Sequence, residues 1–464
     1  MRDLLLDLDL SSHKQRGLES ALRDAIRSGR LHPGEVLPSS RSLAADLGLA
    51  RSTVVAAYDQ LASEGYLLTR QGASTRVAAG HWNPEQPAAH EPRHYRIDLI
   101  PGEPDASQFP RAAWLRSTRE VLATSPADLF AYGDPSGLPA LRTELARYLR
   151  RTRNLAASAD AITVVPGAAS GLGQLARLLL ARGASTIAVE DPGFPFHHAI
   201  LRREGLRLEP VPVDGEGIDT DRLAATDAAA VLVTPAHQYP LGVVMSAERR
   251  ASLASWARRC NAWIIEDDYD AEFRYDRHPI GALQGIAADR VAYLGTSSKT
   301  LGAGLRVAWL VLPPGLREAL AEQRGRDSDV SQLGQATLAH FIARGDLDRH
   351  IRRMRTRYRT RRDSLLTAIR SALDPMDVQG VSAGLHLTVT LTSKAHEEGV
   401  IGDALAKHNL ALWGLRQHYQ IDPAAHGLVL GFSRTSTDFG ASLTQLAEIL
   451  RAHQVRATPR PAHP

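Results

Sequence analysis

The chain has 464 residues, of which 44% are apolar and 23% charged, with a formal net charge of +4. These values describe a soluble globular protein with more than one domain, and the small net charge gives only a weak indication of a nucleic-acid partner. The single cysteine, Cys260, excludes an intramolecular disulfide and fits a reducing compartment. No apolar run approaches the roughly 18 residues of a membrane span, so we expect a cytoplasmic protein without a membrane partner.

Composition shifts along the chain predict two modules and a linker. Residues 11–78 form a compact block, and 79–96 combine Pro, His and charge without apolar periodicity, which is typical of a linker. Residues 97–455 alternate short apolar runs with longer amphipathic segments, which indicates an α/β fold with a mostly parallel sheet. A smaller C-terminal α+β part is expected from about residue 375.

The front block begins with helical periodicity. Leu18, Leu22 and Ile26 recur at helical spacing. Ser39 or Ser40 can cap a second helix that runs through Leu47, after which Gly48 supplies a turn.

A third helix and a hairpin complete the block. Ser52 or Thr53 opens the third helix, which runs through Glu64, and the hairpin follows. This is the order of a helix-turn-helix followed by a β-wing.

A helix-turn-helix places the start of its second helix in the major groove of DNA. In this block that helix is the third one, and its start presents Arg51, Ser52 and Thr53. Arg41 in the preceding helix and Arg70 in the wing would then lie on phosphates. An ordinary three-helix interaction domain with solvated arginines explains the same spacing, so spacing alone leaves both interpretations open.

The string GRLHPGEVLPSSRSLAADLGLARSTVVAAYDQLASEGYL resembles the winged-helix domain of GntR-type transcription regulators over nearly the whole block. The resemblance implies binding to a double-stranded DNA operator, with contacts from Ser39, Arg41, Arg51, Ser52, Thr53, Arg70 and Gly72. One departure is visible, because the wing sequence that follows Gly72 lacks the family's second glycine.

Lys299 is one of only four lysines, whereas the remaining 51 of the 55 basic residues are arginine. A lysine amine that is positioned and partly deprotonated is a nucleophile toward aldehydes, and its characteristic task is a Schiff base with pyridoxal 5′-phosphate (PLP). That cofactor also needs a carboxylate at the pyridine nitrogen, an aromatic side chain against the ring and a cradle for the phosphate.

Five predicted strands end in groups of these kinds, at the edge of the sheet where ligands bind. The strands cover residues 161–165, 185–190, 228–234, 262–266 and 290–295, and the groups that follow them in order are Gly167-Ala168-Ala169, Phe194, Tyr239, Asp267 with Tyr269, and Thr296 with Lys299. Free N–H groups at a helix start suit a phosphate, and the guanidinium of Arg306 suits it too.

Each piece has an ordinary structural explanation, such as a turn or a helix cap. Their joint occurrence in the expected order favours the cofactor site. No metal site is predicted.

The region from about Ile97 to Leu450 resembles the aspartate-aminotransferase fold (fold type I) of PLP enzymes. Together with the front block it resembles the MocR subfamily of GntR regulators, which includes GabR-like and PdxR-like members. The most specific strings are IDLIPGEPD, YGDPSGLPALR, VEDPGFP, TPAHQYPLGVVMS, IIEDDYDAEFRY and GTSSKTLGAGLRVAWLVLP.

The resemblance implies a role for each residue that matches the motifs. Lys299 forms the internal aldimine with PLP, and Asp267 holds the pyridine nitrogen protonated. The other implied cofactor contacts are Tyr269 to the 3′ oxygen, Phe194 stacked on the ring, Tyr239 in the place of an asparagine, Thr296, Arg306 and the Gly167–Ala169 loop at the phosphate, and Tyr132 at the phosphate of the partner subunit in a homodimer.

The chain departs from the aminotransferase pattern where a substrate carboxylate binds. Val429 stands where a late arginine is usual, and Arg434 is too far along to substitute unless a strand bulge brings it near. GabR-like members carry another arginine where this chain has Phe196. In the phosphate loop Ala168-Ala169 replaces a hydroxyl or amide, which leaves Ser170 as the nearest hydroxyl.

A buried carboxylate without a partner costs several kcal/mol, so these losses argue against ligands like γ-aminobutyrate. We expect a PLP-dependent transcriptional regulator with PLP itself, or a small amino-containing molecule, as effector. The alternatives are an aminotransferase with an accessory DNA-binding head and a DNA-binding scaffold without cofactor.

An arginine-rich segment at 345–366 also suits DNA. However, Ile351, Met354, Tyr358 and Leu365 keep a helical stripe, which favours a long helix packed on the body. Supplementary phosphate contacts from Arg352 and Arg355 stay open.

Overall fold

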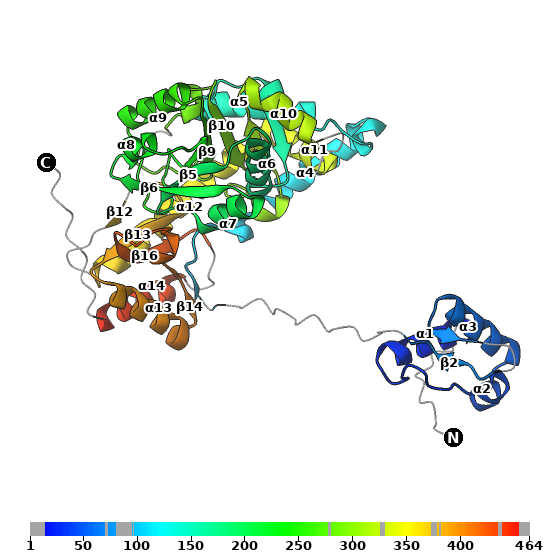
Figure 1. Cartoon of the computed structure of the whole chain (residues 1–464). Coiled ribbons are helices and arrows are strands. Elements are labelled where there is room, and N and C mark those ends of the chain that lie inside the picture. The colour runs from blue at the N-terminus through cyan, green and yellow to red at the C-terminus, as the bar shows by residue number, and fades with distance from the viewer. Residues whose placement is uncertain are drawn as a thin grey trace. The chain divides into compact units, whose positions relative to one another are not determined.

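The structure is a computed structural model that describes residues 14–69, 73–79, 95, 97–276, 280–324, 330–372, 378–379, 382–434 and 439–453. The chain divides into two compact units, Met1–His94 and Tyr95–Pro464, which Figure 1 shows with their elements labelled. None of the described helices combines the length and apolar character that crossing a membrane requires.

The smaller unit is a winged helix-turn-helix. Its elements are α1 (Lys14–Arg27), α2 (Ser40–Leu47), α3 (Arg51–Ser63), β1 (Leu67–Leu68) and β2 (Arg76–Val77). The two strands pair antiparallel, and Val36 bridges to Arg76 as a third edge.

Local sequence explains where these helices begin and end. The Ser39 hydroxyl accepts a hydrogen bond from the Ser42 backbone N–H, and Gly48 closes α2 in the left-handed conformation, so the predicted cap and turn are confirmed. The predicted start of α3 at Ser52 or Thr53 is wrong by one or two residues. Helix α3 begins at Arg51 after Ala50, whose side chain cannot cap it.

The smaller unit, called the head below, has a hydrophobic core of its own. This core forms where one stripe from each helix meets the inner face of the hairpin. It includes Leu18, Leu22, Val54, Leu61 and Val77, each fully buried. Burying these side chains, at about 25 cal/mol per Å² of apolar surface, stabilises a unit with short strands.

The larger unit is built on an eight-stranded sheet in the order β4-β11-β10-β9-β8-β5-β6-β7. Neighbours from β10 through β6 are parallel, whereas β11 and β7 run antiparallel to theirs. The strands are β4 (Ile162–Val165), β5 (Thr186–Asp191), β6 (Arg207–Asp214), β7 (Gly217–Ile218), β8 (Ala230–Val233), β9 (Trp263–Asp268), β10 (Val291–Thr296) and β11 (Ala308–Val311). The mostly parallel sheet is therefore confirmed.

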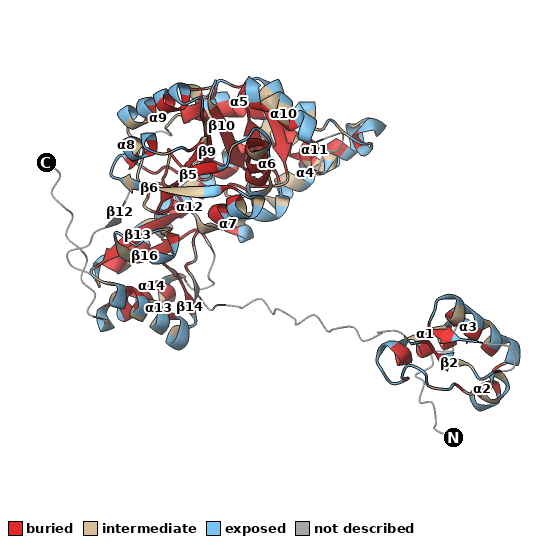
Figure 2. Cartoon of the chain, in the orientation of Figure 1, coloured by how far each residue is buried: buried red, intermediate tan, exposed pale blue. Residues whose placement is uncertain are grey.

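Helices cover both faces of this sheet, so most of its strands are buried, as Figure 2 shows in red, whereas β6 near one edge is half-buried or exposed along most of its length. One face packs on α6 (Ala168–Ala181), α7 (Pro195–Glu204) and α10 (Pro314–Arg324). The other packs on α5 (Pro139–Arg153), α8 (Thr220–Ala224), α9 (Ala247–Arg259) and α11 (Gln332–Ala343). Helix α4 (Arg111–Thr124) packs on α11 and belongs to a segment that projects from the body in Figure 1.

A smaller part of this unit is formed near the C-terminus. Its four-stranded antiparallel sheet has the order β12-β13-β16-β15, from β12 (Val378–Gln379), β13 (His386–Leu391), β15 (Trp413–Gly414) and β16 (His426–Gly431). Helices α13 (Lys394–His408) and α14 (Phe439–Ala452) cover it, and a short parallel pair joins β3 (Ile97–Asp98) to β14 (Leu410–Ala411).

Helix α12 (Asp346–Arg370) joins the two parts of the unit. The predicted stripe of Ile351, Met354, Tyr358 and Leu365 is buried. Arg355 donates two hydrogen bonds to the Glu272 backbone oxygen, so this arginine fastens α12 to the body.

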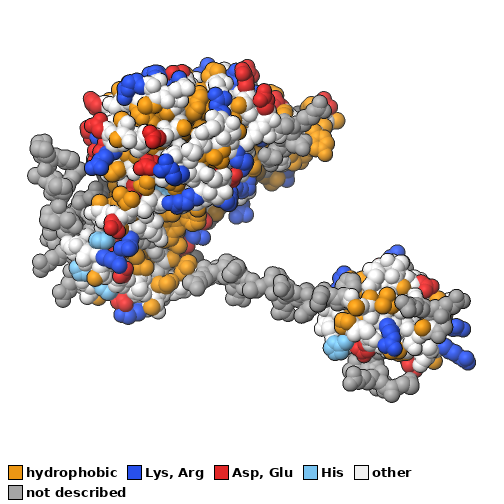
Figure 3. Space-filling model, in the orientation of Figure 1, with side chains coloured by type: hydrophobic (Ala, Val, Ile, Leu, Met, Phe, Trp, Pro, Cys, Tyr) orange, Lys and Arg blue, Asp and Glu red, His pale blue; other side chains and the backbone are white. Residues whose placement is uncertain are grey.

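The face of the larger unit that Figure 3 presents mixes blue and red side chains. It shows no single basic surface over the described residues in view.

Candidate functional site

A cavity of about 230 Å³ lies at the carboxyl ends of the central strands. Strand ends from β5, β8, β9 and β10, the start of α6 and the first residues of the small sheet all contribute to its wall. The sequence-predicted residues that line it are Ala168, Ala169, Phe194, Tyr239, Asp267, Tyr269, Thr296, Lys299 and Arg306. Residues separated by more than 130 positions in the chain are therefore brought together.

Lys299 follows β10, and its side chain lies inside this cavity. Its Nζ donates a hydrogen bond to the backbone oxygen of Gly102. Burial lowers the pKa of Lys299, although the neighbouring Asp267 and Asp270 carboxylates oppose this effect. A lowered pKa increases the fraction of neutral amine, which is the nucleophilic form.

Asp267 belongs to β9 and points into the cavity, whereas its neighbours Glu266 and Asp268 bond elsewhere. Burial raises the pKa of Asp267 to about 8, against the opposing effect of Lys299. Its Oδ2 lies 3.5 Å from His197 Nδ1, and its Oδ1 is buried without a hydrogen-bond partner among the described residues. A buried carboxylate oxygen without a partner suits a protonated ring nitrogen of a ligand.

The strand end around Asp267 is held from behind. Asp268 forms a buried pair with Arg153 at 2.6 Å and accepts from the Tyr293 hydroxyl at 2.7 Å. Glu266 accepts from the backbone N–H groups of Leu283 and Gln284. These bonds fix β9 and therefore the position of the Asp267 side chain.

One end of the cavity has the chemistry of an anion site. Helix α6 begins at Ala168 after Gly167, which has a φ of +98°, and a Cβ at this glycine would lie 2.6 Å from an Arg306 nitrogen. Thr296 and Ser298 also lie here, with their hydroxyls 3.0 Å apart. A helix start, two hydroxyls and a guanidinium together suit a phosphate.

Aromatic side chains form another wall. The ring centroid of Phe194 lies 5.0 Å from that of Tyr239 and 4.9 Å from that of His197. Phe196 stacks on Trp413 of the small sheet at 6.0 Å. These rings offer faces against which a planar ligand can pack.

The side of the cavity away from the anion site, called the far side below, has no cationic partner for a carboxylate among the residues that line it. The described cationic side chains in the lining are Lys299 and Arg306. Burial lowers the pKa of His197 and of His386 to about 3, and that of His198 to about 4, so these imidazoles are neutral near pH 7.

The two residues that the sequence singled out for this function lie elsewhere. Val429 is buried in β16 opposite Thr388 and Trp413. Arg434 pairs with Asp98 and with Glu103 and is not among the residues that line the cavity. Strands β13 and β16 pair in unbroken register, so the described part of β16 has no bulge that would bring it near.

Several residues of the cavity were missed by the sequence reasoning. Ser298 lines the cavity, whereas Ser170, the hydroxyl that the sequence suggested, accepts a hydrogen bond from Gln174 and is not among the lining residues. His197 follows Phe194 by one helical turn, so helical periodicity in VEDPGFPFHH could have found it. No local signal marks His386, which comes from another sheet.

Glu190 at the end of β5 was also missed. Its carboxylate accepts hydrogen bonds from the Thr234 hydroxyl at 2.6 Å and from Gln238. Burial raises the pKa of Glu190 to about 7.

Tyr132 is 94% exposed and is not among the residues that line this cavity. In the head, Ser39, Arg41, Arg51 and Ser52 are exposed and Thr53 is half-buried. The predicted contacts Arg70 and Gly72 lie outside the described residues.

This combination of folds defines a class of protein. The larger unit matches the family of class I and II aminotransferases over residues 97–418, and the smaller unit matches the bacterial regulatory proteins of the gntR family over residues 14–77.

Relatives of similar architecture are regulators by name. The chain is 34% identical to the HTH-type pyridoxine biosynthesis transcriptional regulator PdxR of Corynebacterium glutamicum, over 93% of this chain and 96% of that protein. It is 33% identical to the probable rhizopine catabolism regulatory protein MocR of Rhizobium meliloti, over 93% and 92%. The chain therefore belongs to the MocR-like family of GntR-type transcriptional regulators, in which a helix-turn-helix domain is joined to an aminotransferase domain.

Solved structures agree on the fold of the larger unit. The structure of an archaeal alanine:glyoxylate aminotransferase superposes with a TM-score of 0.70 at 25% identity, covering 77% of this chain and 91% of that one. That of the Pyrococcus horikoshii kynurenine aminotransferase gives 0.69 at 24% identity, covering 77% and 91%.

Proposed function

We propose that this regulator binds PLP in the cavity around Lys299 and that bound PLP changes its affinity for an operator. The observation that carries the proposal is the buried Asp267 Oδ1, which has no partner among the described residues and shares the cavity with the Lys299 amine. A ligand that places a protonated nitrogen at this carboxylate and an aldehyde at this amine satisfies both.

The residues of the cavity divide the work of holding PLP. Asp267 would pair with the ring nitrogen, and His197 at 3.5 Å would keep its carboxylate oriented. Phe194 would pack against the ring, and Tyr269 would donate to the ring oxygen. Tyr239 would close the same wall.

At the anion site of the cavity, the Gly167–Ala169 helix start, Thr296 and Arg306 would bind the phosphate, and Ser298 joins them in our proposal. PLP bound here supplies an aldehyde carbon that reacts with primary amines.

A homodimer is part of this proposal. Tyr132 belongs to the projecting segment, where Leu115, Leu122 and Phe130 are also at least half exposed, and Figure 3 shows orange side chains at its tip. Exposed apolar groups of this size are typical of a subunit interface. We propose that a second copy covers this segment and receives Tyr132 at its phosphate site.

For the head, we propose that α3 enters the major groove with Arg51, Ser52 and Thr53 leading. Contacts to the DNA backbone, or to the groove that the wing enters, would come from Ser39, Arg41, Arg70 and Gly72. The exposed start of α3 supports this arrangement. A regulator that binds an operator in this way acts in the cytoplasm.

The cofactor part is tested by adding PLP to the purified protein and recording its absorption. We expect a visible band at one equivalent per chain that resists dialysis, and its loss in Lys299→Ala. Lys394→Ala is the matched control, because Lys394 is half exposed and pairs with Glu398. A colourless wild type, or an equal band in Lys299→Ala, would reject the proposal.

The DNA part is tested by the salt dependence of binding to operator fragments selected from genomic DNA. Each lost phosphate contact reduces the slope of log K against log[salt] by about 1. We expect this change in Arg41→Ala, which removes a proposed phosphate contact, whereas Arg355→Ala should keep the wild-type slope because its guanidinium holds the Glu272 carbonyl.

The intact lysine and aspartate also favour a residual transamination half-reaction. We expect it to be slow, because a substrate carboxylate finds no cation on the far side of the cavity. Mixing PLP-loaded protein with amino acids and following loss of the visible band measures it, and rapid turnover with an oxo acid would instead identify a working aminotransferase.

A further inference from the structure

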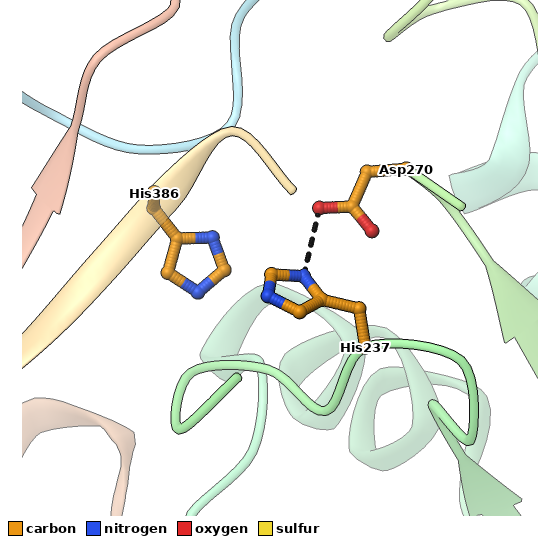
Figure 4. A group of neighbouring side chains, drawn as sticks. All are labelled: His237, Asp270 and His386. Atoms are coloured by element: carbon orange, nitrogen blue, oxygen red, sulfur yellow. Dashed lines mark hydrogen bonds and ion pairs between the residues drawn. The ribbon is translucent and has the colours of Figure 1, made fainter. Parts of the chain in front are cut away.

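Three buried side chains form a cluster beside the cavity: His237 in the loop after β8, Asp270 after β9, and His386 at the start of β13. Figure 4 shows His237 and Asp270 joined by a hydrogen bond and the His386 ring facing them from the small sheet. Their nearest ligand atoms lie within 4.8 Å of one another.

This cluster is already organised by hydrogen bonds. His237 Nδ1 lies 3.0 Å from Asp270 Oδ2 and 3.1 Å from the Tyr269 hydroxyl oxygen, and His386 Nε2 lies 3.1 Å from the Pro240 backbone oxygen. These bonds fix the orientation of the His237 and His386 rings.

The direction of these bonds follows from the groups that make them. A carboxylate oxygen accepts, so His237 Nδ1 carries the hydrogen and donates it. The Tyr269 hydroxyl donates its one hydrogen to the His237 backbone oxygen at 3.1 Å, and its oxygen can accept from His237 Nδ1, whose hydrogen is shared with Asp270 Oδ2. To donate to bound PLP, the O–H group would turn from that backbone oxygen toward the ring oxygen and keep the bond from Nδ1.

The packing leaves His237 little room to turn away. His237, Asp270 and His386 are all at most 4% exposed. A Cβ at Gly384 would lie 2.1 Å from His237 Cε1, and this glycine has a φ of +72°, so the small sheet approaches the imidazole with bare backbone. Asp270 in turn fixes the ring through its 3.0 Å bond.

We propose that His237, oriented by Asp270, is a positioning residue that strengthens the Tyr269 hydroxyl as a donor toward bound PLP. The inference rests on the proposed cofactor site. An N–H bond to the phenol oxygen polarises its O–H group, because hydrogen bonds in a chain reinforce one another. Tyr269 thereby binds the ring oxygen of the cofactor more strongly.

Charged and titratable groups around Tyr269 oppose this effect. Burial raises the pKa of Tyr269 well above its usual value, and Asp270, Tyr239, Asp267 and Glu190 raise it further. His237 supplies the donor on the other side, and the His386 ring, whose centroid lies 5.1 Å from that of His237, is neutral near pH 7.

The readout is the pH midpoint of the visible absorption change of PLP-loaded protein. A stronger donor at the ring oxygen withdraws electron density from that oxygen. It thereby lowers the basicity of the nitrogen that would join Lys299 to the cofactor. His237→Ala should therefore raise the midpoint, by roughly 0.5 to 1 pH unit for the loss of one neutral hydrogen bond. Tyr269→Phe should raise it further.

Amide variants separate a lost donor from a lost ring. His237→Asn places an amide N–H near the position of Nδ1 and should keep a midpoint close to that of wild type. His237→Gln places its amide near Nε2 and should shift the midpoint as alanine does. The comparison of Asn with Gln decides the question even if the alanine variant fails to fold.

A double-mutant cycle then tests the route through Tyr269. In a Tyr269→Phe background His237→Ala should cause no further shift. His426→Asn is the matched control, because His426 lies 3.8 Å from the Glu397 carboxylate in the small sheet and does not line the cavity.

An unshifted midpoint in both His237→Ala and His237→Gln, or an equal shift of His237→Ala in the phenylalanine background, would overturn the inference. Loss of the visible band from wild type would instead overturn the proposed cofactor site, so the two failures are distinguishable.

Discussion

The two ends of the cavity around Lys299 differ in what they leave unsatisfied. At one end, the Asp267 Oδ1 is buried without a described partner, and a helix start, two hydroxyls and a guanidinium form the anion site. At the other end, Phe196 stacks on Trp413, and the nearby imidazoles are neutral. The first end therefore suits a charged, planar ligand, whereas the second offers no cation to a carboxylate, which is the difference on which our proposal of a PLP-binding regulator rests.

The largest expected effect on PLP affinity comes from changing Asp267. Asp267→Asn keeps the shape of the side chain but removes its charge, and losing one partner of a buried charge pair costs about 3 to 5 kcal/mol. We expect PLP affinity to fall by roughly 100-fold or more, measured by equilibrium titration of the visible band. Asp289→Asn, at an exposed pair with Arg258, is the control and should bind PLP as wild type does. Equal affinities of all three proteins would contradict the pairing.

The lack of a cation at the far end can be tested by adding a positive charge there. Phe196→Arg places a guanidinium at a largely exposed position that lines the cavity. A charge-assisted hydrogen bond contributes about 1.5 to 3 kcal/mol, so amino acids should change the spectrum of PLP-loaded protein at concentrations at least about tenfold lower. Phe196→Leu, which carries no charge, should respond to amino acids as wild type does.

The pH dependence of stability separates the two ends in the protein without PLP. Because burial raises the pKa of Asp267 to about 8, above its unfolded value, this group binds more protons when folded and costs stability as pH rises from about 4 to 8. Asp267→Asn should therefore gain stability relative to wild type over this range, measured by denaturant unfolding. PLP should reverse the order, and a pH-independent difference would contradict the assignment.

The smallest effect is expected at the aromatic contact between the two parts of the larger unit. Phe196→Ala removes the stack on Trp413, which is worth about 0.5 to 1.5 kcal/mol, and should lower the free energy of unfolding by this amount while leaving PLP affinity within about twofold. Phe196→Leu keeps an apolar contact and should lose less. A large loss of PLP affinity would place Phe196 at the cofactor instead.

The sequence predicted the groups that follow directly from a strand. Thr296, Asp267, Phe194 and Lys299 each occupy the first positions after or at the end of an apolar run, and the geometry of a parallel sheet brings such positions to one edge. The helix cap at Ser39 was predictable for the same reason, because capping is a local property.

The remaining parts of the site depend on side-chain directions and on packing between distant segments. Choosing Ser298 over Ser170 requires knowing which face of a turn meets the cavity. The bond from His237 to Asp270 joins loops 33 residues apart, and the pairing of Arg434 with Asp98 joins segments 336 residues apart. Periodicity carries no information about such contacts.

The most direct test of the account measures operator binding with and without PLP. Wild-type protein freed of cofactor is titrated with selected operator DNA at fixed salt, and the titration is repeated with saturating PLP and with a panel of amino acids. We expect PLP to change the affinity of wild type by at least about fivefold, the lower end of typical coupling between sites, and to leave that of Lys299→Ala unchanged. An affinity that ignores PLP but responds to an amino acid would contradict the account.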